Sequence, residues 1–179
     1  MGGRGGMSIK DAWAPWTNSE IVLFHGTLRQ HAHAIIDNGV DVSAGGERKD
    51  FGRGFYTTTF QWQAERWSRV QSDRNQGRAP AVVRLVLDRE TLSRQDSIVF
   101  IRGTFDADDY WSFVSHCRDG RSHKPSSGGY YDVTYGPVAS MWLGRGNSRV
   151  IPRYDQIGFH SNRSQDMLND RSICQIGVL

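Results

Sequence analysis

Three short segments near the start of the chain carry residue types suited to holding a flat ring that bears an amide. They read LFHGT at 23–27, DFGRGFYTT at 50–58 and QWQAERW at 61–67. His25 supplies a polar anchor at the end of a predicted strand, and the glycines at 52 and 54 let a ligand approach the backbone closely. Tyr56 and Trp67 add two large aromatic faces. Nicotinamide, the amide-bearing ring of NAD, is the ligand that this combination predicts.

The elements that must position these residues follow from periodicity and turn residues. Helices are expected at 29–38, 61–76, 106–119 and 166–169, and strands at 21–24, 55–59, 81–87, 98–101, 130–138, 156–160 and 173–179. In the helix at 61–76, Trp62, Ala64, Trp67 and Val70 form a stripe that is expected to face inward. Helices lie mainly in the first two-thirds of the chain, and strands crowd toward its end. This order favours an α+β fold around a mixed or antiparallel sheet.

Length and composition bound the class of protein. The 179 residues suit one domain, with a glycine-rich tail or linker at 1–18 that is expected to be flexible and a folded domain at 19–179. No apolar run approaches the roughly 18 residues that a membrane span needs, and no secretory signal is visible. A cytoplasmic location, or delivery into the cytosol of a target cell, is therefore expected. Two cysteines are too few for a disulfide framework.

Charged and metal-binding residue types narrow the partners. The chain has 22 Lys and Arg against 19 Asp and Glu, a net charge of +3, and nearly all of its basic residues are arginine. Arginine binds phosphate through planar, two-pronged hydrogen bonds, but no basic stripe interleaved with aromatic residues is evident. A protein is therefore favoured over RNA or DNA as the macromolecular partner. His31 and His33 match no zinc spacing, so no metal is predicted. Asp50 is expected to pair with an arginine or to cap its turn.

Four motifs, taken in order, resemble a known family. LFHGT, DFGRGFYTT with the downstream QAERW, YYDVTYGPVAS at 130–140 and DQIGFHS at 155–161 are together similar to the DUF3990 group of the ADP-ribosyltransferase superfamily, close to its diphtheria-toxin-like branch. The resemblance covers roughly Ile21 to the C-terminus. It implies the ADP-ribosyltransferase fold, a split β-sheet core with flanking helices, and NAD as co-substrate without a metal.

The resemblance also implies roles for individual residues. His25 resembles the first-motif histidine that holds the ribose on the adenosine side of NAD. Gly26 resembles the backbone that binds the carboxamide of nicotinamide, and Thr27 and Phe55 flank these positions as further cofactor contacts. Tyr56 resembles the second-motif tyrosine that stacks on the nicotinamide ring. These residues together would form the NAD site.

The third motif departs from the family pattern. Trp67 falls where relatives place an aromatic wall opposite Tyr56, and Gln156 falls where many relatives carry the catalytic glutamate. Glutamine keeps the hydrogen bond to the ribose next to nicotinamide but lacks the charge that stabilises a developing oxocarbenium ion, a contribution of several kcal/mol. Asp155 could supply the anion, although alternation along a strand directs its side chain to the opposite face.

The activity that the resemblance implies is NAD-dependent mono-ADP-ribosyl transfer by a toxin or effector. Such an enzyme cleaves nicotinamide from NAD and transfers ADP-ribose to a macromolecule. Arg145, Arg149 and Arg153 lie on a predicted loop at 144–153, where enzymes of this kind recognise the acceptor, or they are simply solvated there. A cognate immunity protein or antitoxin is a further implied partner. Two alternatives stay open: an NAD glycohydrolase with water as acceptor, and an NAD-binding module weakened by Gln156.

Overall fold

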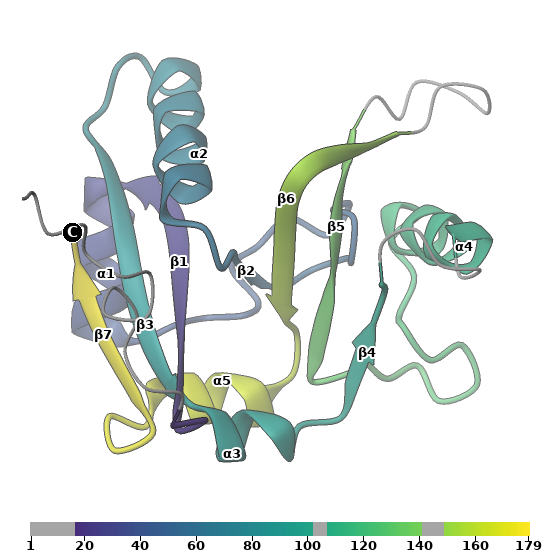
Figure 1. The fold of residues 1–179 in the computed structure, drawn as a ribbon. Helices are drawn as coiled ribbons and strands as arrows, with labels where there is room; N and C mark the ends of the chain where they lie inside the picture. Colours follow the sequence, from purple (N-terminus) through teal and green to yellow (C-terminus); the bar gives the residue numbers. More distant parts are fainter. Residues whose placement is uncertain (1–16, 102–106, 141–148) are drawn as a thin grey trace, which may run out of the picture.

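A computed structural model describes residues 17–101, 107–140 and 149–179 of the chain (Figure 1). The elements are β1 (Glu20–Leu28), α1 (Arg29–Asn38), β2 (Phe55–Thr57), α2 (Gln61–Arg74), β3 (Pro80–Asp88), α3 (Arg89–Ser93), β4 (Ser97–Val99), α4 (Ala107–Arg118), β5 (Val133–Ser140), β6 (Arg149–Phe159), α5 (Asn162–Asn169) and β7 (Cys174–Val178). The expected tail at 1–18 lies almost entirely outside the described residues. None of the described helices combines the length and the apolar character that crossing a bilayer requires.

The strands form two sheets that meet along β1 and β2. The first sheet has the order β1-β3-β7 and is antiparallel throughout. The second has the order β2-β6-β5-β4, in which β4 and β5 run parallel and the other neighbours run antiparallel. In the described part of the chain, one isolated bridge between Phe24 and Thr58 links the sheets. The predicted α+β architecture around mixed and antiparallel sheets is thereby confirmed.

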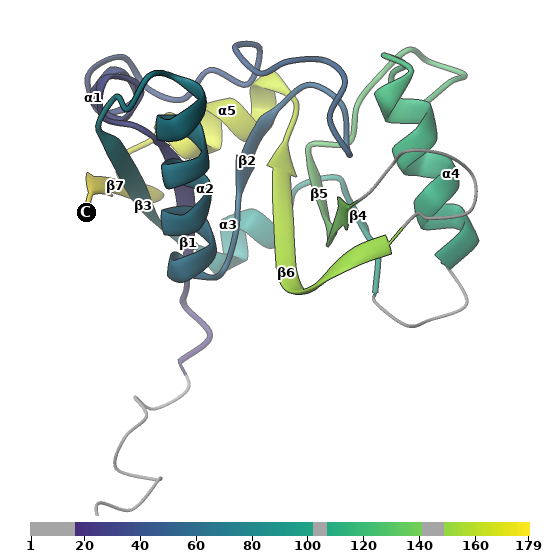
Figure 2. The ribbon, with the colours of Figure 1, turned by 90° about the horizontal axis from the view of Figure 1, so that it is seen from above.

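Helices cover the faces of both sheets. α2 crosses one face of the first sheet, α1 lies on its other face, and α4 covers the face of the second sheet that points away from the first (Figures 1 and 2). α1 ends at Gly39, whose φ of 90° is a conformation that favours glycine. α5 begins with a capping box, in which the side chains of Ser161 and Ser164 each accept from the other's backbone N–H.

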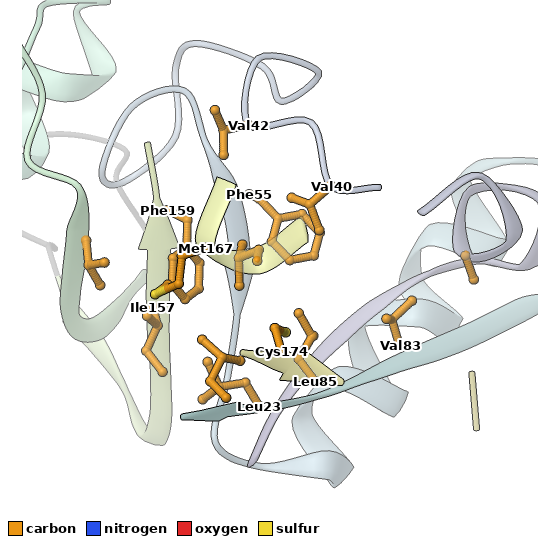
Figure 3. Close-up of a cluster of buried hydrophobic side chains, with 14 of the residues drawn as sticks. Leu23, Val40, Val42, Phe55, Val83, Leu85, Ile157, Phe159, Met167 and Cys174 are labelled. Carbon is orange, nitrogen blue, oxygen red and sulfur yellow. The ribbon is translucent and has the colours of Figure 1, made fainter. Parts of the chain in front are cut away.

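Two apolar cores hold these layers together. The larger core lies between the sheets, and Figure 3 shows side chains from both of them converging there, among them Leu23, Val83, Leu85, Phe55, Ile157 and Phe159. The smaller core lies between the second sheet and α4 and consists of Phe51, Phe100, Tyr110, Val114 and Ala139. The second sheet is therefore packed on both faces, which makes its inner strand β6 a rigid support for side chains.

The predicted inward stripe of α2 is wrong at its two tryptophans. Trp62 and Trp67 are 45% and 48% exposed, whereas Gln63, Ala64 and Ser68 are buried. The reason lies on β1, where a Cβ at Gly26 would stand 2.0 Å from the carbonyl oxygen of Ala64. The helix approaches the strand so closely that only small side chains fit between them, and the tryptophans are turned outward.

Candidate active site

The candidate site begins where β1 and β2 part. Phe24 N–H donates to Thr58 O (2.8 Å), and Thr58 N–H donates to Phe24 O (2.9 Å). Backbone groups two residues apart on a strand face the same edge, so those of Gly26 also face β2, where the register sets them opposite Tyr56. Within the described residues, no further bridge joins the two strands beyond Phe24. The N–H and C=O of Gly26 thus lie side by side at an open strand edge.

Trp67 lies on the exposed side of α2. It stands one turn beyond Gln63 on the same side of the helix, and the Gln63 side chain bonds both the backbone N–H and the C=O of Asp155 on β6. Trp67 is therefore turned away from the core, on the side of α2 that carries Gln63. The Arg74 guanidinium lies 5.6 Å from the centre of its ring. The Trp67 side chain keeps about half of its surface exposed.

The His25 side chain lies on the face of β1 opposite to that of Gly26, and it reaches across the split to β2. Its Nδ1 lies 2.6 Å from Tyr56 O. Because a carbonyl oxygen only accepts, Nδ1 carries the hydrogen in neutral imidazole and Nε2 is left as an acceptor. Desolvation lowers the pKa of His25 to about 4, and the nearby Lys49 and His31 act in the same direction. The ring is therefore neutral near pH 7 and able to accept a hydrogen bond from a hydroxyl group.

Tyr56 is fixed through its hydroxyl group. The hydroxyl donates to Gly52 O (2.7 Å) and accepts from Phe51 N–H (3.1 Å). Burial raises the pKa of Tyr56 well above its ordinary value, so the hydroxyl stays protonated. Lys49 Nζ lies 5.3 Å from the centre of the Tyr56 ring. One side of the ring is therefore accessible to a positive charge, which its π electrons attract.

Gln156 lies on the same face of the second sheet as Tyr56. The ladder pairs Tyr56 with Gly158, and Gln156, two residues earlier on β6, points to the same side. Gln156 is 8% exposed. Its Nε2 donates to Asp50 Oδ2 and to Pro137 O, both at 2.9 Å. Since both partners only accept, the orientation of the amide is determined, and Oε1 is the acceptor that remains.

Asp50 anchors this arrangement. The Arg118 side chain on α4 donates to Asp50 Oδ1 from Nε (3.1 Å) and from Nη2, and Ala139 N–H donates to Oδ2 at 2.8 Å. The predicted pairing of Asp50 with an arginine is confirmed. Its contact with Gln156 was not predicted, because it joins residues 106 positions apart in the chain. An acidic residue at the start of the glycine-containing motif is the signal that could have pointed to it.

Asp155 lies on the opposite face of β6, as strand alternation predicts. Its carboxylate accepts from the hydroxyl of Thr58 and from both the N–H (3.0 Å) and the hydroxyl of Thr59. The carboxylate therefore binds the connection between β2 and α2. It does not stand beside Gln156 as a second anion.

Phe55 and Thr27 lie on the core side of their strands. Phe55 is buried, and the centre of its ring is 4.4 Å from that of His25. Thr27 is also buried, and along β1 it shares a face with His25. The structure does not bring either side chain to the face that carries Tyr56 and Gln156. Phe55 points away from it because adjacent strand residues alternate between faces.

The prediction of an acceptor loop at 144–153 is wrong for the second half of this segment. β6 begins at Arg149, so Arg149 and Arg153 lie on the strand, and Arg145 lies outside the described residues. The strand starts early because the pairing with β5 resumes beyond a change of register. At that irregularity Arg153 is exposed and has a φ of 64°, and Figure 1 shows β6 bending toward this end.

A largely exposed aromatic cluster, which the sequence did not predict, includes the residue next to Arg153 in the chain. The rings of Phe60 and Trp62 are 5.7 Å apart between centres, and those of Trp62 and Tyr154 are 4.9 Å apart and edge-on. The cluster joins the start of α2 to β6. Its exposure follows from the close packing of α2 on Gly26, which a stripe of apolar residues read from the sequence does not reveal.

Other parts of the molecule offer less chemistry. Two surface hollows of about 490 and 510 Å³ are lined by other residues than His25, Tyr56 and Gln156. Among the described residues, no group of three His, Cys, Asp or Glu side chains could hold a metal ion. Burial raises the pKa of the Cys117 thiol to about 12 and that of Cys174 to about 11, so neither is a reactive nucleophile.

The fold and site together define an α+β protein with two sheets that part beside an ordered tyrosine–glutamine face. A family model described as "Protein of unknown function (DUF3990)" matches residues 21–143. This match covers more than half of the chain, and the chain belongs to the DUF3990 family. It includes His25 and Tyr56 and ends before Gln156. A comparison with curated proteins gives no match.

Proposed function

We propose that this chain is an NAD-dependent mono-ADP-ribosyltransferase that modifies a macromolecule as a toxin or effector. The observation that carries the proposal is the open edge of Gly26 opposite Tyr56, with the oriented amide of Gln156 on the Tyr56 face. A carboxamide can pair with an adjacent N–H and C=O through two hydrogen bonds. Nicotinamide in NAD is a flat, positively charged ring with such a group, and Tyr56 has a cation against its ring.

Each residue has a task in the cleavage of NAD. The bond between nicotinamide N1 and ribose C1′ breaks, its electron pair leaves with nicotinamide, and a nucleophile of the acceptor attacks the resulting oxocarbenium ion and loses a proton. Gly26 and Tyr56 hold the leaving group. Gln156 Oε1 accepts from a hydroxyl of the adjacent ribose and directs its partial negative charge to the cation. Nε2 of His25 accepts from a hydroxyl of the adenosine-side ribose.

A weakly catalytic NAD-binding module is the second candidate. The observation that favours it is the neutral amide of Gln156, together with the pairing of the nearby Asp50 carboxylate to Arg118. Such a site offers the oxocarbenium ion no unpaired carboxylate from either residue. Electrostatic stabilisation of this kind is worth several kcal/mol, and its reduction would leave binding without fast turnover.

A protein acceptor fits the exposed surface beside the site. Phe60, Trp62 and Tyr154 lie next to the exposed Arg153, and Trp, Tyr and Arg are the residue types that dominate binding energy at protein interfaces. A protein bound there would approach β6, which carries Gln156. We expect Trp62→Ala to reduce transfer to the acceptor about 10-fold and to leave NAD hydrolysis unchanged, since one such contact contributes about 1–2 kcal/mol.

The test is incubation of the protein with labelled NAD in a bacterial and a eukaryotic lysate. Gln156→Ala is the test variant, and Gln175→Ala, at an exposed position of β7, is the matched control. Label on a protease-sensitive species, lost with Gln156→Ala and kept with Gln175→Ala, supports the transferase with a protein acceptor. Free nicotinamide without transferred label indicates a glycohydrolase. A rise in melting temperature with NAD but no turnover indicates the binding module. If NAD causes neither a rise in melting temperature nor turnover, both candidates are overturned.

A further inference from the structure

We infer that Asp50 is a positioning residue, which determines the end of the Gln156 amide that faces the substrate. In catalysis this inference rests on the proposed function, because the ribose hydroxyl that Gln156 would meet belongs to NAD. The orientation itself is a property of the free protein. It depends on an irregularity between β5 and β6 and on a charged acceptor held in place by α4. It also depends on the ability of glutamine, unlike glutamate, to donate to that acceptor.

The irregularity supplies both ends of the arrangement. The ladder pairs Gly136 with Gln156 and Pro137 with Asp155, and then its register shifts before Ala139. On the two sides of the shift, side chains take the place of regular ladder partners: Gln156 Nε2 donates to Pro137 O at 2.9 Å, and Ala139 N–H donates to the Asp50 carboxylate at 2.8 Å. Gln156 and Asp50 therefore meet because the two strands stop pairing regularly at this point.

The hydrogen bonds of Asp50 fix it as an acceptor toward Gln156. Its Oδ1 accepts both hydrogen bonds from Arg118, and its Oδ2 accepts from Ala139 N–H and from Gln156 Nε2. A flipped amide would set Gln156 Oε1 against Oδ2 and against Pro137 O, with no hydrogen between these acceptors. Hydrogen bonds to an ionised acceptor are about twice as strong as neutral ones. The flipped orientation is therefore disfavoured, and Oε1 is directed away from Asp50.

The same geometry accounts for glutamine at this position. A glutamate at 156 would place a second carboxylate at the distance of the present 2.9 Å hydrogen bond from Asp50, and beside the Pro137 carbonyl. Like charges at this separation repel strongly in a buried site. Residues 50 and 156 thus form a matched pair, in which one must accept and the other must donate. Glutamate fits at 156 only when residue 50 becomes a donor.

The experiment is a double-mutant cycle with Gln156→Glu, Asp50→Asn and the two changes combined. NAD cleavage and unfolding by urea are measured for each at pH 8. Gln156→Glu is expected to lose at least 10-fold in NAD cleavage. The combined variant is expected to regain at least 10-fold over Gln156→Glu and to be more stable than the sum of the two single losses predicts. Asp50→Asn alone is expected to lower kcat while KM changes less than threefold.

Asp155→Asn combined with Gln156→Glu is the matched control, since Asp155 is an equally buried carboxylate one residue away on the other face. It should give no recovery in either measurement. Additive losses in the Asp50 cycle, with the combined variant lowest in both stability and activity, would mean that Asp50 only supports the fold, and would overturn the inference. If the wild type neither binds nor cleaves NAD, the proposed function fails. Coupling in the unfolding measurements then still decides the orientation.

Discussion

The two faces of β6 carry adjacent buried residues with opposite roles. On one face, the Asp155 carboxylate accepts from two threonine hydroxyls and a backbone N–H, and so joins β6 to the start of α2. On the other face, Gln156 donates through its amide nitrogen and keeps its oxygen as an acceptor. Asp155 is bonded throughout by its own chain, whereas Gln156 is oriented but has bonding capacity left. The first arrangement stabilises a fold, and the second is suited to a substrate.

Charge is distributed differently around the two residues. Asp155 is a carboxylate among neutral hydroxyl donors, whereas Gln156 is neutral and has its charged neighbours, Asp50 and Arg118, directly behind it. In the candidate site the negative charge therefore belongs to Asp50, which bonds Gln156, and not to Gln156 itself. The comparison predicts that changes at Asp155 act mainly on stability and that changes at Gln156 act mainly on activity.

The largest expected effect is the loss of stability in Asp155→Ala. The change removes the acceptor for the buried Thr58 and the half-buried Thr59 and leaves their donors without this partner, at about 1–3 kcal/mol for a fully buried group. The free energy of unfolding, measured with urea, should fall by about 3 kcal/mol. Asp155→Asn keeps one accepting oxygen and should lose less. A loss below about 1 kcal/mol for Asp155→Ala would contradict the stabilising role of Asp155.

Gln156→Ala is expected to decrease kcat for NAD cleavage by about 100-fold, the usual effect of losing one electrostatic contact to a transition state. Its unfolding free energy should change by only about 1 kcal/mol. Pro137 O still accepts from the Tyr110 hydroxyl (2.9 Å), and the Asp50 carboxylate still accepts from Ala139 N–H. Steady-state kinetics and urea unfolding on the same preparation measure both. Destabilisation as large as that of Asp155→Ala would show that the two faces do not differ.

At Tyr56, the ring should act mainly on NAD binding and the hydroxyl mainly on stability. Tyr56→Leu removes the aromatic face and should weaken NAD binding about 10-fold, as expected for a ring contact of about 0.5–1.5 kcal/mol. Tyr56→Phe keeps the face and loses the bonds to Gly52 O and Phe51 N–H, so it should cost about 1 kcal/mol of stability with near-normal binding. Calorimetric titration with NAD distinguishes them. Equal loss of binding in both variants would assign the effect to the hydroxyl.

The smallest expected effect is a pH dependence that comes from His25. Its pKa in the folded state is about 4, below the ordinary 6.5, so the unfolded chain takes up the proton first. The stability that His25 contributes is complete above pH 6.5 and is lost as the pH falls toward 4. His123 and His160 have lowered pKa values as well, so the slope should become shallower, but not vanish, in His25→Gln. NAD affinity should stay constant from pH 8 to about 5.5, and a decrease near 6.5 would contradict a neutral His25.

Local signals in the sequence were sufficient for much of the fold. The helix at 29–38 ends at Gly39 as predicted, and the α+β order of elements is confirmed. The opposite orientations of Asp155 and Gln156 followed from alternation alone, since the chain direction of a strand sets which side each residue faces. Tyr56 and His25 were also predicted to contribute to one site, and the structure places His25 Nδ1 2.6 Å from Tyr56 O.

The remaining features depend on contacts between distant segments. The aromatic residues of α2 look like a core stripe, but the fit of Ala64 against Gly26 turns Trp62 and Trp67 outward. A periodic pattern reports the apolar residues of a helix and not how closely its neighbour approaches. In the same way, the composition of 144–153 is that of a loop, yet Arg149 pairs with Ser140 on β5.

The sequence by itself therefore determined most of the element types and the alternation of its strand faces, since both depend on spacing within a few residues. Its resemblance to DUF3990 relatives pointed to His25, Tyr56 and Gln156 as candidate residues. Tertiary structure decided which amide end of Gln156 is available, because Asp50 lies 106 residues away and meets it only where β5 and β6 change register. It also decided that, within the described residues, the sheets part beyond one bridge. Hydrogen bonds between distant residues depend on the packing of whole layers, which no local pattern encodes.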